Sequence, residues 1–230
     1  MDNMEKQVKS LSNQMVERSF SVQHRDVTFD LVESSIKSSI FEAVDSLLTN
    51  EPRGLLLLGP VGSGKTSILS LVLGLYIEKI AERYMKFIQK EGVRGWEERL
   101  YRDTFGYCCD NYHFYTHDDL VSKLRSIKED TQERSEFFHR EPAEASRKLV
   151  LVDDLGRGYD DKGGWNLSLL DEYFDYRWKN QLPLFITTNK GATGNNSIRN
   201  WTGWERIVDR LCDSKFMTSI VINRESFRKR

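Results

Sequence analysis

The chain has 230 residues, of which 39% are hydrophobic and 11% aromatic, so it can bury the core of one domain and wholesale disorder is excluded. Its 34 basic and 35 acidic side chains leave a formal net charge of −1, which excludes a polybasic, histone-like protein but not a local basic face. The three cysteines, two of them adjacent (Cys108 and Cys109), make neither a disulfide framework nor a tetrahedral zinc site, so we expect a reduced, cytoplasmic setting. The longest apolar runs, such as Leu55–Leu58, are far shorter than the roughly 20 residues of a membrane span, and we expect no membrane contact.

The N-terminal quarter of the sequence predicts a polar segment, a helix and a buried strand. Residues 1–26 are polar with only a weak helical stripe, so we expect a short helix or tail outside the core. Apolar residues then recur at helical spacing from Ile36 to Leu48, and the turn-forming residues 50–54 end that helix. The four leucines of Leu55–Leu58 predict a strand buried on both faces, as strands of parallel sheets are.

The middle of the chain predicts a long helix, a strand and a capped helix. Residues 68–76 are apolar nearly all round, and an amphipathic pattern continues the helix toward Gly92. A strand is expected within Tyr107–Tyr115. Thr116 and Asp119 have the spacing of a capping box, which predicts the start of the next helix.

The last third of the chain alternates strands with helices. The highly charged residues 128–148 are expected to form a surface loop or an exposed helix. The elements expected after them are the strand Leu149–Val152, the helix Leu167–Trp178, the strand Pro183–Thr188, the helix Trp204–Leu211 and the strand Phe216–Ile222. Strands that alternate with helices predict an α/β fold with a parallel sheet.

A glycine-rich loop lies between the first buried strand and the helix after it, and it fits the phosphate-binding pattern G-x-x-x-x-G-K-[ST], or Walker A. Glycines let consecutive backbone N–H groups turn inward around phosphate oxygens, and the following helix adds the partial positive charge of its N-terminus. Lys65 is expected to reach the β- and γ-phosphates of a nucleotide, and the Thr66 hydroxyl to ligate Mg²⁺. The predicted nucleotide-binding residues are Gly59, Pro60, Val61, Gly62, Ser63, Gly64, Lys65 and Thr66.

Two carboxylates end the strand Leu149–Val152. Packing does not explain Asp153 and Asp154 at this point, because a buried charge needs a partner; a solvated loop start is the alternative interpretation. One such carboxylate can hold the shell of Mg²⁺ while the next activates a water for attack on the γ-phosphate. The third buried strand ends in the polar residues Thr187, Thr188 and Asn189, which are candidates for contact with the γ-phosphate or that water, although a strand that enters a turn explains them equally well.

The nucleotide base is expected to be adenine. Asn189-Lys190 begins like the N-K-x-D guanine motif of GTPases, but Ala192 stands where that motif has aspartate. ATP is therefore the expected nucleotide, with Mg²⁺ as its metal.

Two arginines lie one turn apart on the predicted helix Trp204–Leu211. Arg206 and Arg210 project from the same face, and like charges at that spacing repel unless an anion lies opposite. Ordinary surface pairs, Arg206 with Asp209 and Arg210 with Asp213, are the alternative explanation.

Four segments together resemble one family: GLLLLGPVGSGKT (54–66), VLVDDLG (150–156), PLFITTN (183–189) and ERIVDRL (205–211). They look like the DnaC/DnaI/IstB branch of AAA+ ATPases, which comprises bacterial and phage helicase loaders and transposition helpers. The resemblance implies a P-loop AAA+ core with a central five-stranded parallel sheet flanked by helices and a reduced or absent lid. The expected domains are residues 1–26, a polar tail or short helix, and residues 27–230, the ATPase.

The resemblance also implies roles for single residues. Asp153 would be the Walker B ligand of Mg²⁺, Asp154 the acid that activates water, and Asn189 the sensor-1 residue. Arg210 matches the arginine finger that family members insert into the site of a neighbouring subunit. The stretch Val27–Phe29 matches one that passes near the adenine.

The function implied is that of an ATP-hydrolysing replication protein, a DnaC-like loader that acts on a replicative helicase and single-stranded DNA and assembles into an ATP-dependent homo-oligomer. An IstB-like regulator of transposition or recombination is the alternative. A small-molecule P-loop kinase is disfavoured, because no lid with arginines for an acceptor phosphate is evident and the two aspartates suit attack by water.

Residues 78–106 are longer than the family's usual link and are expected to form a helical insertion. Its basic and aromatic side chains suit binding of single-stranded DNA, but acidic residues largely cancel the charge, and packing of a longer helix is the alternative. The residues concerned are Lys79, Arg83, Tyr84, Lys86, Phe87, Lys90, Arg94, Trp96, Arg99, Tyr101 and Arg102.

Overall fold

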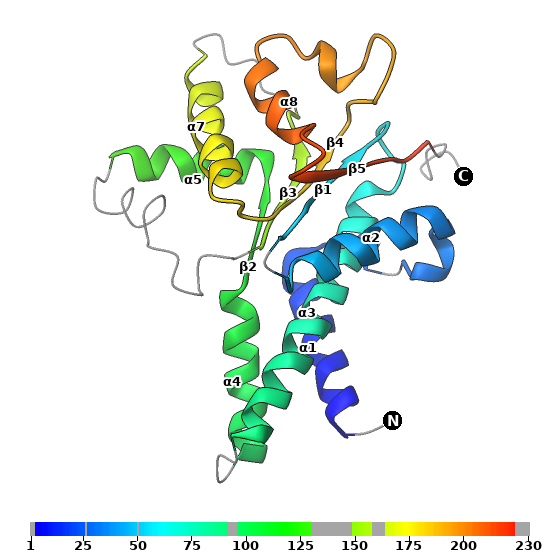
Figure 1. The fold of residues 1–230 in the computed structure, drawn as a ribbon, viewed down its shortest axis with the longest axis vertical. Coiled ribbons are helices and arrows are strands. Elements are labelled where there is room, and N and C mark those ends of the chain that lie inside the picture. The colour runs from blue at the N-terminus through cyan, green and yellow to red at the C-terminus, as the bar shows by residue number, and fades with distance from the viewer. Residues whose placement is uncertain are drawn as a thin grey trace.

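The computed structural model describes residues 3–25, 27–49, 51–91, 96–129, 149–157 and 164–223. These residues contain one sheet of five parallel strands in the order β2-β3-β4-β1-β5 (Figure 1). The strands are β1 (Gly54–Leu58), β2 (Tyr112–Thr116), β3 (Leu149–Leu155), β4 (Leu184–Thr188) and β5 (Met217–Val221). Parallel pairing requires crossover connections, so each strand starts at the same edge of the sheet and all five end at the other.

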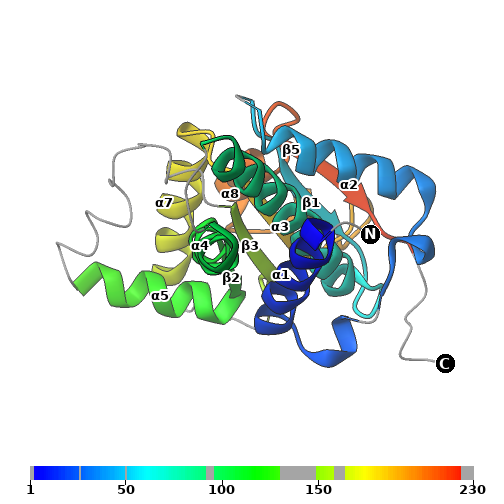
Figure 2. The same cartoon turned by 90° about the horizontal axis from the view of Figure 1, so that it is seen from below.

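Helices cover both faces of the sheet. They are α1 (Asn3–Ser19), α2 (Ser34–Ser46), α3 (Lys65–Lys90), α4 (Trp96–Asp110), α5 (His117–Glu129), α7 (Trp165–Lys179) and α8 (Glu205–Leu211). Helices α1 to α4 lie on one side, and α5, α7 and α8 lie on the other (Figures 1 and 2).

The strands supply side chains alternately to the two faces. Leu55 and Leu57 of β1 pack with α1, α2 and α3, whereas Leu56 and Leu58 pack with α5, α7 and α8. All four are nearly or fully inaccessible to solvent. The continuous run of leucines therefore reflects burial on both faces, and the predicted α/β fold with a parallel sheet is confirmed.

The predicted capping box is present at the start of α5. The backbone N–H of Asp119 donates to Thr116 Oγ1 at 3.2 Å, and the N–H of Thr116 donates to Asp119 Oδ2 at 3.3 Å. The helix runs to Glu129, and the remainder of the charged stretch, residues 130–148, lies outside the described residues.

The N-terminal segment, for which we expected a short helix or a tail, is a helix. The prediction that it lies outside the core was wrong. Leu11 and Met15 of α1 are 0% exposed and belong to the cluster that covers the sheet. Ser12 Oγ donates to the carbonyl of Gly74 at 3.0 Å, where α1 crosses α3. The weak stripe was misleading because only two apolar side chains of α1, Leu11 and Met15, are fully buried, and small residues, Ser12 and Gly74, let the two helices approach closely.

The strand predicted within Tyr107–Tyr115 is shorter than expected. Helix α4 continues through Asp110, and β2 begins only at Tyr112. Cys108 explains the difference, because this residue is 0% exposed and packs in the core as part of the helix. Aromatic residues of high strand propensity were thus overridden by tertiary packing.

The lower ends of α1, α3 and α4 project together beyond the sheet (Figure 1), and we call this projection the helical arm. It contains most of the predicted insertion, residues 78–106, and its helices pack against one another. Tyr84 of α3 stacks on Tyr107 of α4 with ring centroids 4.4 Å apart, whereas Phe87 is 56% exposed. Packing therefore accounts for Tyr84 but not for Phe87. Arg94 and the side chains of Trp96 and Arg99 lie outside the described residues.

No helix in the described ranges is both long enough and apolar enough to cross a membrane.

The packing of α1 predicts that this helix is needed for stability. Met15→Ala should lower the free energy of unfolding by about 2–5 kcal/mol, because it leaves a cavity between α1 and the rest of the core. Lys6→Ala, an exposed position on the same helix, should change it by less than about 0.5 kcal/mol. Urea denaturation of the whole chain measures both. Equal stability of Met15→Ala and the wild type would mean that α1 only rests on the surface.

Candidate active site

The glycine-rich loop leaves β1 at Leu58 and ends at the first turn of α3. Gly59, Gly62 and Gly64 have φ angles of 154°, 80° and 92°, a region that side chains disfavour. A Cβ on Gly59 would lie 2.4 Å from the carbonyl oxygen of Ile222, so space as well as conformation requires glycine there. The loop therefore turns its backbone toward the N-terminus of a 26-residue helix, an arrangement that attracts anions.

The side chain of Lys65 lies between this loop and Asn189. Its Nζ donates to the carbonyl oxygens of Gly59 at 2.9 Å and Pro60 at 2.8 Å, and to Asn189 Oδ1 at 3.0 Å. The side chain is buried, and burial lowers the pKa of Lys65, while the negative charges of Asp154 and Asp153 oppose that shift. The ammonium group is thus held between the loop and the end of β4.

Asp153 lies beside Thr66, as a shared magnesium site requires. Thr66 Oγ1 is 3.1 Å from each carboxylate oxygen of Asp153, and Thr187 Oγ1 donates to Asp153 Oδ1 at 2.5 Å. Burial raises the pKa of the Asp153 carboxyl, and the hydrogen bond from Thr187 opposes the shift.

One hydroxyl and one carboxylate fit the way proteins bind Mg²⁺ together with a nucleotide. This ion takes oxygen ligands and is usually held by one or two carboxylates, waters and substrate phosphates. Within the described ranges, no group of three or more His, Cys, Asp or Glu side chains is placed to hold a metal ion. Thr66 and Asp153 are therefore the residues that would hold Mg²⁺, with the remaining ligands supplied by phosphates and water.

Asp154 has an unusual backbone conformation. Its φ is 54°, in the left-handed region, and the pairing of β3 with β4 shifts register between Val152 and Leu155. The N–H of Asp154 donates to Thr187 Oγ1 at 2.8 Å, which holds the irregular turn in place. Because of this irregularity in the strand, the two consecutive aspartates face different partners: Asp153 faces Thr66, and Asp154 faces Asn189.

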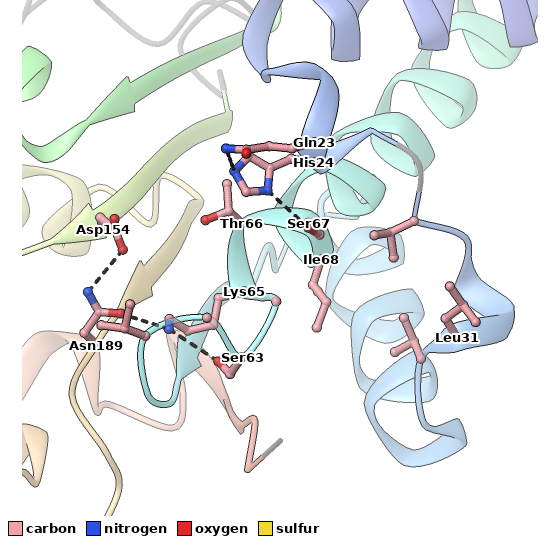
Figure 3. A pocket seen from close by; sticks show the side chains of 15 residues that line it. Gln23, His24, Leu31, Ser63, Lys65, Thr66, Ser67, Ile68, Asp154 and Asn189 are labelled. Carbon is pink, nitrogen blue, oxygen red and sulfur yellow. Dashed lines mark hydrogen bonds between the residues drawn. The ribbon is translucent and has the colours of Figure 1, made fainter. Parts of the chain in front are cut away.

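Asn189 connects the two halves of the site (Figure 3). Its Oδ1 accepts from Lys65 Nζ, and its Nδ2 donates to Asp154 Oδ1 at 3.3 Å. This position follows from topology, because β4 lies between β1 and β3 in the sheet. The structure thus brings together Lys65, Thr66, Asp153, Asp154 and Asn189.

All of these residues except Asp153 line a cavity of about 520 Å³, a size suited to a nucleotide. Lys65, Asp154 and Asn189 lie at its polar end, and Val27, Leu31, Val32 and Ile68 line an apolar portion. Gln23 and His24 also line it, and sequence reasoning missed both, because nothing in the polar segment 1–26 marks them as functional.

Trp201 packs against the loops that follow β3 and β4. Gly156 has a φ of 81°, and a Cβ there would lie 2.0 Å from Trp201 Cζ2. Trp201 stacks on Trp204 with centroids 4.0 Å apart, and Lys190 Nζ lies 5.2 Å from the centre of the Trp201 ring. Gly156, two residues after Asp154, and Lys190, directly after Asn189, thus contact the same aromatic ring.

Arg210 is not among the residues that line this cavity. Its guanidinium, with a side chain 13% exposed, binds Asp171 and Asp175 of α7, with Nη1 2.9 Å from Asp171 Oδ1. Arg206, 76% exposed, also lies near Asp171, at 3.4 Å. The pairs predicted as the alternative, Arg206 with Asp209 and Arg210 with Asp213, were therefore wrong: both arginines pair across helices. The finger role of Arg210 stays a prediction.

No protein-family model matches the chain, and no curated protein matches it. Among solved structures, the DnaC helicase loader superposes with a TM-score of 0.50 and 17% identity over 91% of this chain and 99% of that one. DnaI gives 0.45 and 18% over 87% of each chain. A putative primosome component from Streptococcus pyogenes serotype M3 gives 0.48 and 16% over 96% of each.

The similarity to the DnaC helicase loader establishes the fold. The chain shares the fold of that protein, with a parallel five-stranded sheet between two layers of helices, as its motifs led us to expect. The predicted resemblance is confirmed for the fold, through the DnaC helicase loader.

The left-handed conformation of Asp154 yields a stability test. Asp154→Gly should be more stable than Asp154→Ala by about 1 kcal/mol, because both remove the carboxylate but only alanine is strained at a φ of 54°. At Asp103, an exposed position within α4, the usual order should hold, with alanine the more stable. Urea denaturation of the four nucleotide-free variants measures this. Alanine equal to or better than glycine at position 154 would contradict the strain.

Proposed function

We propose that this protein is a magnesium-dependent ATPase that acts in DNA replication as a DnaC-like helicase loader. The observation that carries the ATPase proposal is the meeting of Lys65, Thr66, Asp153, Asp154 and Asn189 at one edge of the sheet, joined by hydrogen bonds. Each has a role in nucleotide hydrolysis that its chemistry supports.

Binding of the triphosphate engages the loop and Lys65. The N–H groups of the loop and of the first turn of α3 face the phosphates, and Lys65 exchanges its carbonyl partners for β- and γ-phosphate oxygens. Mg²⁺, when bound to Thr66 and Asp153, neutralises charge that develops on the phosphates.

Hydrolysis requires an oriented water. Asp154 accepts its proton, and Asn189 fixes the carboxylate of Asp154 relative to Lys65 through its two hydrogen bonds. The amide of Asn189 thus sets the distance between Lys65, which attracts the γ-phosphate, and Asp154, which activates the attacking water.

The base is adenine in this proposal. The apolar lining of the cavity offers a surface for a purine ring, and the aspartate that would read guanine is replaced by Ala192.

The partners proposed are a replicative helicase, single-stranded DNA and further copies of this chain. The DnaC helicase loader, whose fold this chain shares, motivates them. Copurification from cells that express a tagged chain at native level tests the assignment: a replicative helicase supports the loader, and a transposase in its place would favour the IstB-like alternative.

Replacement of Lys65 tests the ATPase proposal. Lys65→Ala should reduce ATP turnover by roughly 100-fold or more, because it removes the positive charge that faces the phosphates. The fold should be retained, which circular dichroism checks. Lys215→Ala, an exposed lysine outside the cavity, is the matched control. Normal ATP affinity and turnover in Lys65→Ala would refute the site.

The finger role proposed for Arg210 requires it to leave Asp171 and Asp175 on assembly. Arg210→Lys keeps a positive charge for both carboxylates but loses the planar guanidinium, so the fold should survive. In the assembled state this variant should lose at least about 10-fold in ATPase activity. Mixing it with Asp154→Asn subunits should restore part of the activity, because mixed interfaces can combine an intact Arg210 with an intact Asp154. Full activity of Arg210→Lys alone would show that the arginine only connects α8 to α7.

A further inference from the structure

The segment between α1 and α2 enters the nucleotide cavity. Helix α1 ends at Ser19, and the short helix η1 (Val22–His24) places Gln23 and His24 in the wall of the cavity. These residues lie outside every motif that the sequence offers.

Hydrogen bonds hold His24 against the first turns of α3. Its Nδ1 lies 3.2 Å from Ser67 Oγ, and its carbonyl oxygen accepts from Ser70 Oγ at 2.6 Å. Its other ring nitrogen, Nε2, lies 3.2 Å from Nε2 of Gln23. The ring is therefore oriented from both sides, and it is only partly buried.

The position of His24 in the cavity points to one part of the nucleotide. Lys65 and Asn189 lie at the end of the cavity where the terminal phosphate would bind, and Leu31 and Ile68 lie on the apolar side. In Figure 3, His24 and Gln23 lie next to Thr66, to the right of Asn189 and to the left of Leu31. In a nucleotide, the ribose and the α-phosphate lie between the base and the terminal phosphate.

The chemistry of these side chains suits an anion. Ring N–H and amide N–H₂ groups donate hydrogen bonds, and phosphate oxygens accept them. Thr66 and Ser67 belong to the first turn of α3, whose N–H groups and partial positive charge favour a phosphate at the same place.

We propose that His24, oriented by Ser67 through Nδ1, is a nucleotide-binding residue whose Nε2 exchanges Gln23 for an oxygen of the α-phosphate. This inference rests on the proposed ATP site and adds to it a contact from outside the phosphate-binding loop. It also gives α1 a functional connection, since the residues that follow this core helix bind the ligand directly.

The test compares ligands that differ by one phosphate, with the whole chain in each case. Binding of ADP, AMP and adenosine is measured by calorimetry or competition for wild type, His24→Ala and His113→Ala. His113 is an exposed histidine of β2 outside the cavity, and it serves as the matched control. His24→Ala should weaken ADP and AMP by roughly 10-fold each and leave adenosine unchanged, because only the first two carry the α-phosphate. His113→Ala should bind all three like wild type.

A second variant separates binding from anchoring. His24→Asn keeps a short side-chain donor toward Ser67 but has no second ring nitrogen to present to a phosphate. It should restore the nucleotide-free melting temperature toward that of wild type while AMP binding stays weak. Recovery of AMP affinity together with stability would overturn the proposal and leave His24 as an anchor of η1.

The remaining outcomes are equally distinct. If wild type binds ADP and His24→Ala binds it as tightly, the contact is refuted while the ATP site stands. An equal loss of affinity for adenosine and AMP also refutes it, because the α-phosphate is then not what His24 contacts. If wild type binds no adenine nucleotide, the proposed function fails, and this inference fails with it.

Discussion

The pairing of β4 with both β1 and β3 is the constraint on which the site depends. Leu58 and Leu155 are both in register with Thr188, so three strands that are far apart in sequence end beside one another. Asp153, Asp154 and Asn189 lie within two residues of the ends of β3 and β4. Lys65 and Thr66 follow the glycine-rich loop that leaves β1. A slip of one residue in either pairing would exchange the two faces of a strand and move its carboxylate or amide away from Lys65 and Thr66.

Helix α1 is the second element that organises the molecule. This helix covers α3 along the part that leads away from the phosphate-binding loop, and it contacts α4 through side chains such as Gln14, which donates to Tyr101 Oη. Its C-terminal end leads into the cavity wall. Helix α1 therefore belongs to the helical arm at one end and, through η1, leads into the wall of the cavity at the other, two regions that the sheet alone would not connect.

Much of this architecture could be predicted from the sequence, because strong local signals and the tertiary structure agree. The buried runs at Leu55–Leu58 and Leu149–Val152 form strands, and the motif residues meet as their chemistry suggested. What the sequence did not reveal depends on contacts between distant segments. The burial of α1 comes from small residues at a helix crossing, the pairing of Arg210 with α7 from the packing of two helices, and the approach of His24 from a turn with no motif of its own.

The stacked indoles of Trp201 and Trp204 have a practical consequence. Trp201 contacts Gly156, two residues after Asp154, and its neighbour Lys190 directly follows Asn189. Indole emission depends on the local field and on stacking, so a displacement of either loop would change the intrinsic fluorescence. The protein thus contains its own optical reporter next to the end of the cavity lined by Asp154 and Asn189, which would allow events there to be followed in real time in unlabelled protein.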